Sequence, residues 1–233
     1  MDKMTDEELY AQFGTFISDN KLALFDRIAP TRMRHVTVVL EDIYQSQNAS
    51  AVVRTCDLLG VQDLHIIENR NAYNLNPDVT LGSSKWVELH RWRESKDNTM
   101  DCVRALRAKG YRIAATSPHG NSVDLKDLDL STPIAFCFGT ELEGLSEELL
   151  AASDTRVRIP MHGFTESYNI SASAAIILFN VTERLRASDV HWQLSAAEIL
   201  QLKLEWARKT RHHASLIEER LRAGSSQRDD TSA

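Results

Sequence analysis

Short apolar runs that alternate with helical segments constrain the fold of this chain more than any other feature. The runs are rich in β-branched residues and span 35–41, 63–68, 111–116 and 133–138. Runs of this length are typical of strands buried in a parallel sheet. Segments with helical spacing lie between them, at 50–59, 100–109 and 146–152. Gly60 and Gly110 directly follow the first two of these segments, as is common after a helix. Strand and helix in alternation predict an α/β fold with a parallel sheet.

Helical patterns also occupy both ends of the chain. Apolar residues recur at helical intervals over 7–28 and stop before Pro30, which predicts one or two docking helices. Two long helices are predicted near the other end, over 169–187 and 195–222. The apolar face of the first consists of Ile170, Ala174, Ile177, Leu178, Val181 and Leu185. We therefore expect an N-terminal helical extension (1–34), an α/β domain (35–187), a C-terminal helical extension (188–223) and a polar, disordered tail (224–233).

The overall charge does not indicate a nucleic-acid partner. The 27 Lys and Arg residues are outnumbered by 33 Asp and Glu residues, which gives a formal net charge of −6. A basic binding face must therefore be local. No apolar run reaches the roughly 18 residues of a membrane span, and residues 1–6 are acidic where a signal peptide is basic. We expect a cytoplasmic protein with no membrane partner.

The cysteines give no sign of a metal or disulfide framework. Cys56, Cys102 and Cys137 lie far apart, without a CxxC pair or a matching histidine spacing. The sequence therefore predicts reduced, mostly buried thiols and no metal site.

Polar residues in the segments that follow the strands are the candidates for chemistry, because ligands bind at the carboxyl ends of the strands in open parallel sheets. Asn48 or Ser50 is a candidate N-cap of the helix after the first strand. Arg54 lies further along the same helix among apolar neighbours. An arginine in such surroundings is often held for an anion such as phosphate, whereas a surface ion pair with Asp57 is the simpler alternative.

Two later loops add further candidates. Gly139 follows a buried strand directly and permits a ligand to approach the backbone. Glu141 disfavours a simple nucleotide phosphate and suits a ligand with positive charge or hydroxyl groups, unless it only caps the next helix. Ser167 and Asn169 precede the small-residue helix, whose N-terminal amides are free for a ligand or a substrate hydroxyl. The alternative for Asn169 is an N-cap alone.

Taken in order, these segments resemble the three motifs of the TrmH (SpoU) family of RNA ribose 2′-O-methyltransferases, in the SPOUT superfamily. The matching segments are Asn48 with Arg54-Thr-Cys-Asp-x-x-Gly60, Phe138-Gly-x-Glu141-x-x-Gly144, and Ile159-Pro-Met-x-Gly163 running into Ser167-x-Asn169-x-Ser171. The likeness covers roughly residues 35–186, and three motifs in the right order are a strong signal.

The resemblance implies a parallel sheet whose C-terminal part forms a deep trefoil knot, an exception to the usual absence of knots. It also implies a homodimer that binds S-adenosylmethionine close to the subunit interface. The cofactor contacts that it implies are Thr116, Gly139, Ile159, Met161 and Tyr168. The catalytic group that it implies consists of Asn48, Arg54, Glu141, Ser167 and Asn169.

The reaction of this family moves a methyl group from a sulfonium to a ribose 2′-hydroxyl. Arginine is essentially always protonated in proteins, so Arg54 is a poor base. We expect Arg54 to hold the adjacent phosphate and to stabilise the developing alkoxide, while the proton leaves through that phosphate or water. Ser167 and Asn169 are expected to hold the ribose or the loop, and Glu141 to orient them.

The substrate is the least constrained part of the prediction. Helical extensions without a separate RNA-binding domain resemble the enzymes that modify guanosine-18 of tRNA, so we expect that substrate. Ribosomal RNA and a non-catalytic RNA-binding module are the alternatives, while a nicotinamide-dependent enzyme lacks its glycine fingerprint here. Glu143 places an extra negative charge near the expected RNA. The residues expected to contact RNA are Lys85, Arg208, Lys209 and Arg211.

Overall fold

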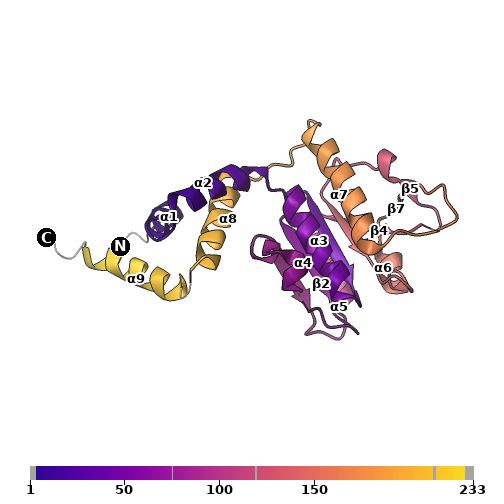
Figure 1. Cartoon of the computed structure of the whole chain (residues 1–233), viewed down its shortest axis with the longest axis horizontal. Helices are drawn as coiled ribbons and strands as arrows, with labels where there is room; N and C mark the ends of the chain where they lie inside the picture. Colours follow the sequence, from indigo (N-terminus) through magenta and orange to yellow (C-terminus); the bar gives the residue numbers. More distant parts are fainter. Residues whose placement is uncertain (1–3, 75, 119, 212–213, 229–233) are drawn as a thin grey trace. The chain divides into compact units, whose positions relative to one another are not determined.

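The computed structural model describes residues 4–74, 76–118, 120–211 and 214–228, with side chains as far as residue 222. The chain divides into two compact units (Figure 1). One unit is formed by residues 33–192 and contains the sheet. The other combines residues 1–32 with residues 193–233 and is helical over its described part. The predicted α/β domain, 35–187, lies inside the first unit.

The sheet unit is built on a parallel sheet. Within the described residues it has seven strands in the order β3-β2-β1-β6-β4-β7-β5, and every neighbouring pair is parallel. The strands are β1 (Val36–Glu41), β2 (Asp63–Ile67), β3 (Glu88–Trp92), β4 (Arg112–Thr116), β5 (Val123–Asp124), β6 (Ile134–Phe138) and β7 (Thr155–Arg158). The predicted α/β class with a parallel sheet is confirmed.

Helices cover both faces of this sheet. Val36, Val38 and Leu40 of β1 belong to one apolar cluster, whereas Val39 belongs to another, because successive strand residues point to opposite faces. The first cluster contains residues of α3 (Ser46–Leu59) and α7 (Ile170–Arg186). The second contains residues of α5 (Asn98–Ala108) and α6 (Glu147–Ala152). Figure 1 shows α3 and α7 side by side on one face, and all six residues predicted for the apolar face of α7 are buried.

The strands outside the predicted apolar runs are β3, β5 and β7, which lie at or next to the edges of the sheet. β3 pairs only with β2 among the described strands, and its charged sequence leaves it partly exposed. β5 is two residues long and pairs with β7 at the other edge. The short helices α4 (Pro77–Thr80), η2 (Ser83–Lys85) and η3 (Leu125–Asp127) are also additional. The predicted C-terminal knot remains a prediction.

The helical unit brings the two ends of the chain together. It contains α1 (Asp6–Gly14), α2 (Asp19–Ile28), η1 (Ala29–Thr31), α8 (Ala196–Lys209) and α9 (Ala214–Arg228). Leu9 and Phe13 of α1 are buried, α1 contacts α8, and the rings of Phe25 and Trp206 lie 5.5 Å apart. The two predicted extensions therefore form one unit rather than two separate additions.

The prediction of one helix over 195–222 is wrong. α8 ends at Lys209, where the amide of the C-cap Thr210 donates to the carbonyl oxygens of Ala207 and Arg208, and α9 begins at Ala214. The side chain of Arg208 then bonds to Glu218 of α9 at 2.8 Å. α9 continues to Arg228, which is within the segment predicted as a tail. No described helix is both long and apolar enough to cross a membrane.

Candidate active site at the carboxyl ends of the strands

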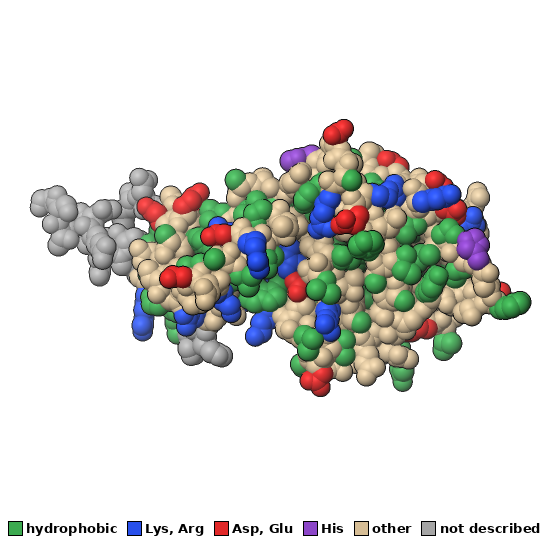
Figure 2. Space-filling model, turned by 45° about the horizontal axis from the view of Figure 1, so that its top comes forward, with side chains coloured by type: hydrophobic (Ala, Val, Ile, Leu, Met, Phe, Trp, Pro, Cys, Tyr) green, Lys and Arg blue, Asp and Glu red, His purple; other side chains and the backbone are tan. Residues whose placement is uncertain are grey.

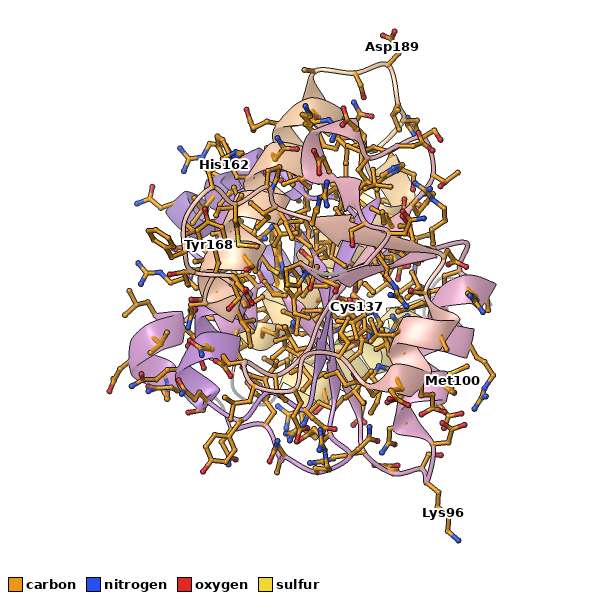
Figure 3. The ribbon with its side chains drawn as sticks, turned by 90° about the vertical axis from the view of Figure 1, so that its right-hand side faces the viewer. Lys96, Met100, Cys137, His162, Tyr168 and Asp189 are labelled. Carbon is orange, nitrogen blue, oxygen red and sulfur yellow. The ribbon has the colours of Figure 1, made fainter. Side chains whose placement is uncertain are left out.

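A cavity of about 710 Å³ opens at the carboxyl ends of β4, β6 and β7, which are adjacent in the sheet. This volume lies in the range of small-molecule and cofactor sites. All five residues predicted to contact the cofactor line it: Thr116, Gly139, Ile159, Met161 and Tyr168. Of the predicted catalytic residues, Glu141, Ser167 and Asn169 also line it. Tyr168 extends from the loop before α7 (Figure 3).

The loop after β6 forms one wall of the cavity and closes tightly on itself. Backbone amides and carbonyls of Thr140 and Gly144 exchange two hydrogen bonds of 3.0 Å. A Cβ atom on Gly139 would lie 2.0 Å from the carbonyl oxygen of Gly144. Gly144 itself has a φ of +71°, a conformation that favours glycine. The two glycines therefore allow the narrow loop that carries Glu141 to the cavity.

A chain of side-chain hydrogen bonds joins three of the predicted catalytic residues. The amide nitrogen of Asn48 donates to Glu141, and the amide nitrogen of Asn169 donates to the Asn48 oxygen at 3.2 Å. Asn48 is 8% exposed, so these bonds form in a largely dry position. Residues from α3, from the loop after β6 and from the start of α7 thus meet in one group, as the resemblance implies.

Asn48 is not an N-cap, contrary to one of the roles considered for it. α3 begins at Ser46 with Gln45 as its N-cap, so Asn48 lies within the first turn of the helix. Ser50 is not the cap either, because its hydroxyl accepts from the amide of Asn76 at 3.0 Å. Asn169 does cap α7, accepting from the amide of Ser171 at 2.9 Å. The same side chain also reaches Asn48, so the cap role and the site role coexist.

Arg54 is the predicted catalytic residue that the structure does not bring to the group. It lies on the exposed side of α3, does not line the cavity, and forms no hydrogen bond or ion pair with another described residue. Leu58, one turn further along α3, is 74% exposed. On α7, which packs against α3, Phe179 is 60% exposed. Arg54 therefore lies outside the cavity of its own chain, one helical turn before the exposed Leu58.

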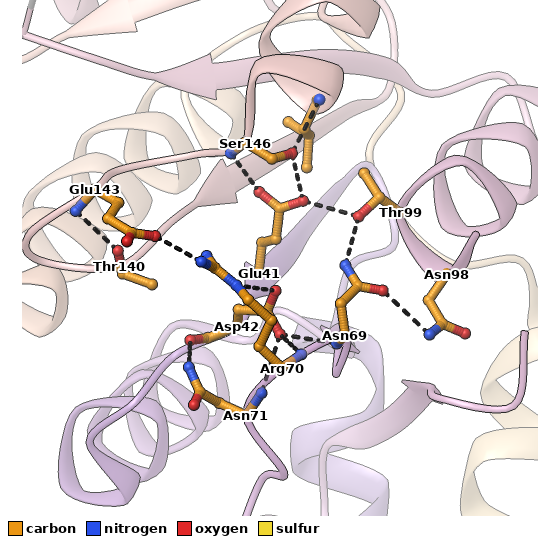
Figure 4. Close-up of polar contacts among 11 residues, drawn as sticks. Glu41, Asp42, Asn69, Arg70, Asn71, Asn98, Thr99, Thr140, Glu143 and Ser146 are labelled. Carbon is orange, nitrogen blue, oxygen red and sulfur yellow. Dashed lines mark hydrogen bonds and ion pairs between the residues drawn. The ribbon is translucent and has the colours of Figure 1, made fainter. Parts of the chain in front are cut away.

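A polar network supports the cavity loop from the side of β1 and β2 (Figure 4). The buried Asp42, whose φ is +52°, accepts from the amides of Asn69 and Arg70, each at 2.8 Å. The Arg70 guanidinium then bonds to Glu143 at 2.8 Å, and this contact raises the pKa of Arg70. The charge of Glu143 is thus paired within the chain, although both side chains are well exposed.

The buried Glu41 joins the same region to α5 and α6. Its carboxylate accepts from the Ser146 amide and hydroxyl, each at 2.8 Å, and from Thr99 at 2.9 Å. Sequence reasoning did not single out Asp42, Glu41 or Arg70. A signal was present for the first two, because paired carboxylates end a buried strand, but their partners are distant in the sequence.

The residues expected to contact RNA are distributed over both units. Lys85 belongs to η2 and is exposed. Lys209 and Arg211 are exposed in the helical unit, and the side chain of neither forms a hydrogen bond or ion pair with another described residue. Arg208, by contrast, bonds to Glu218, which raises its pKa. On the face in Figure 2, Lys and Arg side chains are interspersed with Asp and Glu. Any RNA-binding surface is therefore a local one.

One cluster among the described residues has the spacing of metal ligands, at Asp63, Glu88 and His90. Arg34 bonds to Asp63 at 2.8 Å and to Glu88 at 3.1 Å, so both carboxylates are already paired with the Arg34 guanidinium. Burial alone raises the pKa of Asp63, but the bond to His90 and the charge of Arg34 outweigh it and lower that pKa. This arrangement is explained as an ion-pair network.

The three cysteines are free and buried, as expected. Figure 3 shows Cys137 in the interior, and burial raises its pKa well above the usual value. A buried thiol of this kind is a poor nucleophile, which leaves the cysteines without a role in the site.

Comparison with known proteins agrees with this geometry. The SpoU rRNA Methylase family model matches residues 35–179. A tRNA (guanosine(18)-2′-O)-methyltransferase of Borreliella burgdorferi is 43% identical over 216 residues, covering 91% of this chain and 97% of that one. The Thermus thermophilus protein of the same name is 33% identical over 186 residues, covering 79% and 94%.

Solved structures give the same result. The crystal structure of the Aquifex aeolicus TrmH/SpoU tRNA modifying enzyme has a TM-score of 0.73 and 27% identity, covering 82% of this chain and 97% of that one. The SpoU methyltransferase AviRb from Streptomyces viridochromogenes, in complex with the cofactor AdoMet, has a TM-score of 0.59 and 28% identity, covering 70% and 65%.

A parallel sheet with a cavity of this kind, together with these relatives, defines an RNA methyltransferase. The chain belongs to the SpoU (TrmH) methylase family, which confirms the predicted family and enzyme class. S-Adenosylmethionine is the cofactor of such enzymes, as the AviRb structure illustrates.

Proposed function

We propose that this enzyme methylates the ribose 2′-hydroxyl of guanosine-18 in tRNA, with S-adenosylmethionine as the methyl donor. The observation that carries the proposal is the bonded group of Asn48, Glu141 and Asn169 beside the cavity. The relatives in Borreliella and Thermus are named for this substrate position and match nearly their full length. A tRNA substrate implies that the protein acts in the cytoplasm.

The cavity fits the cofactor in size and in the chemistry of its walls. Backbone groups of the loops around Gly139 and Ile159 supply hydrogen-bond partners for an adenosine, while Ile177 and Leu145 supply apolar surface. When bound, the cofactor supplies an electrophilic methyl group on a sulfonium. The protein's part is to align the hydroxyl with that group, which contributes about 7–11 kcal/mol in favourable models.

The bonded group orients the acceptor ribose. Asn48 fixes the Glu141 carboxylate and the Asn169 amide relative to each other, so that the free sides of these groups face the cavity. Glu141 then accepts from a ribose hydroxyl, and Ser167 holds the same sugar or the loop beside it. The proton leaves through the adjacent phosphate or through water.

We further propose that the active enzyme is a homodimer in which Arg54 serves the cavity of the partner subunit. Arg54 does not line its own cavity, and it precedes the exposed Leu58 by one turn of α3. Phe179 of α7, the helix that packs against α3, is also exposed. Burying such side chains against a second copy is favourable, and a two-fold pairing repeats the contact on both chains. Arg54 then holds the RNA phosphate and stabilises the developing alkoxide.

Mixing two inactive variants tests this arrangement. Arg54→Ala and Asn169→Ala are each expected to be inactive alone. If the two residues act across the interface, mixed dimers contain one intact site, and refolding equal amounts together restores about a quarter of the wild-type activity. If both residues act within one chain, the mixture stays inactive. Analytical ultracentrifugation checks that each preparation is dimeric.

The substrate is tested with labelled S-adenosylmethionine and defined RNAs. We expect transfer to a tRNA transcript and none to the same tRNA carrying deoxyguanosine at position 18, which lacks the accepting hydroxyl. Methylation of ribosomal RNA alone supports the first alternative function. Absence of S-adenosylmethionine binding by calorimetry supports the second, a non-catalytic RNA-binding module.

A further inference from the structure

Arg156 is a cation that the proposed reaction does not use, although it lines the cavity. It belongs to β7 and is half-buried. Its Nη1 atom packs against the loop after β4, where it lies 3.2 Å from the place of a Cβ atom on Gly120. No hydrogen bond or ion pair joins this guanidinium to another described residue. A half-buried arginine of this kind is suited to an anion from outside the chain.

The neighbouring Arg158 provides a contrast. It is on the same strand and also lines the cavity, but its Nε atom bonds to Asp124 at 2.6 Å. The negative charge beside Arg158 is therefore supplied by the chain itself. Arg156 lacks such a partner, so the two arginines differ in what they can still bind.

The proposed cofactor carries three charged groups, and only one of them is negative. A guanidinium repels the sulfonium and the ammonium, and attracts the carboxylate. Guanidinium and carboxylate also match in shape, because two parallel N–H···O bonds can form between them. Arg156 is on the β4 and β7 side of the cavity, whereas Asn48 lies beyond β6 on the β1 side. A carboxylate bound at Arg156 therefore leaves the side of the cavity near Asn48 free for the methyl transfer.

We infer that Arg156 binds the carboxylate of S-adenosylmethionine and holds the amino-acid end of the cofactor beside the loop after β4. The inference rests on the proposal that this cavity is the cofactor site. It adds a residue that none of the sequence motifs contains, because Arg156 precedes the third motif by three positions.

Calorimetry with two ligands tests the inference without a measurement of activity. The first ligand is S-adenosylmethionine, and the second is its decarboxylated form, which keeps the sulfonium and ammonium. Arg156→Ala is expected to weaken binding of the first about 10- to 100-fold, as befits a charged hydrogen-bonded contact. Binding of the second is expected to stay equal or to tighten slightly, because a repelling cation is removed. Arg104→Ala is the control and should change the binding of neither ligand, because Arg104 does not line the cavity and is paired with Asp97 and Asp101 on another part of the sheet unit.

Three outcomes overturn the inference, and they differ from one another. Equal weakening of both ligands means that Arg156 only supports the fold of the cavity. Unchanged binding of both means that the guanidinium serves another partner, such as an RNA phosphate. If the wild-type protein binds neither ligand, the assignment of the cavity fails together with the inference.

Discussion

At the scale of single residues, Arg54 shows how a charge without a local partner constrains a mechanism. It is exposed on α3, and a guanidinium is a poor base in proteins. A residue of this kind binds and stabilises negative charge rather than removing a proton. Its two-pronged shape is as important as its charge for holding a phosphate.

Substitution of Arg54 separates these two properties. Arg54→Lys keeps the charge and loses the paired geometry, so we expect kcat to fall by roughly one to two orders of magnitude, with a larger fall for Arg54→Ala. The affinity for S-adenosylmethionine should not change, because the proposed partner of Arg54 is the RNA phosphate and not the cofactor. Single-turnover methyl transfer measures the effect, and full activity of Arg54→Ala would contradict the proposed role.

His65 predicts how stability depends on pH. Burial, followed by repulsion from the neighbouring His90, lowers the pKa of His65 to about 3. Between this value and the ordinary value of 6.5, the unfolded chain binds a proton that the folded chain does not. The free energy of unfolding is therefore fully retained above about pH 6.5, and it falls by at most about 1.4 kcal/mol per pH unit on acidification.

His65→Asn removes this titration and keeps an acceptor for the Trp92 indole, which donates to His65 Nδ1 at 3.2 Å. Chemical denaturation at pH 7 and pH 5 should show a smaller acid-induced loss for this variant than for the wild type. The exposed His191→Asn serves as the control and should retain the wild-type pH dependence. An unchanged loss in His65→Asn would mean that other groups dominate the acid response.

At the scale of elements, the narrow shape of the loop after β6 depends on glycine, which has no side chain, at position 139. A Cβ atom at Gly139 would lie 2.0 Å from the Gly144 carbonyl oxygen, so the loop of Gly139→Ala must open. We expect at least a tenfold loss of S-adenosylmethionine affinity, roughly 1.4 kcal/mol or more. Gly163→Ala is the control, since its added Cβ has no neighbour closer than 4.0 Å. Isothermal titration calorimetry measures the S-adenosylmethionine affinity of both variants, and equal affinities would contradict this prediction.

The elements also show how far the sequence alone predicts this fold. The buried strands and the apolar face of α7 were predictable because their patterns are local: the strands are short continuous apolar runs, and the apolar residues of α7 recur every three or four positions. The edge strand β3 was missed because its residues are only partly buried or exposed and two of them, Glu88 and Arg91, are charged. The break between α8 and α9 was missed because helical spacing continues across it.

The candidate site was likewise predictable from the sequence only in part. The order of the three motifs predicted that Asn48, Glu141 and Asn169 belong to one catalytic group. No pattern within a single segment predicts the hydrogen bonds between them. The ion pair of Arg70 with Glu143 joins residues 73 positions apart, so it follows only from the packed loops. The position of Arg54 outside the cavity of its own chain follows only from the finished fold, and the proposed second subunit would give it a substrate.

At the scale of the whole molecule, an acidic protein must bind an acidic polymer through few cations. Lys209 and Arg211 are exposed in the helical unit, whereas Arg208 bonds to Glu218. Lys209→Ala combined with Arg211→Ala should lower tRNA affinity and reduce the salt dependence of binding by about one unit of slope per lost phosphate contact. Arg104→Ala, on α5 and bonded to Asp97 and Asp101, is the control. Filter binding over a salt series measures both.

An unchanged slope in the double variant would show that the end of α8 has only a packing role. Cofactor affinity is expected to stay constant in either case, because neither residue lines the cavity. The two measurements therefore separate the binding of RNA from the binding of the cofactor.

The helical unit also sets an order of events during synthesis on the ribosome. Phe13 and Phe25 leave the exit tunnel long before their partner helix, because Trp206 of that helix is made nearly two hundred residues later. The sheet unit lies wholly between them in the chain and can fold while they wait. The nascent protein therefore exposes this apolar surface until α8 has been made, and a chaperone can bind it during that period.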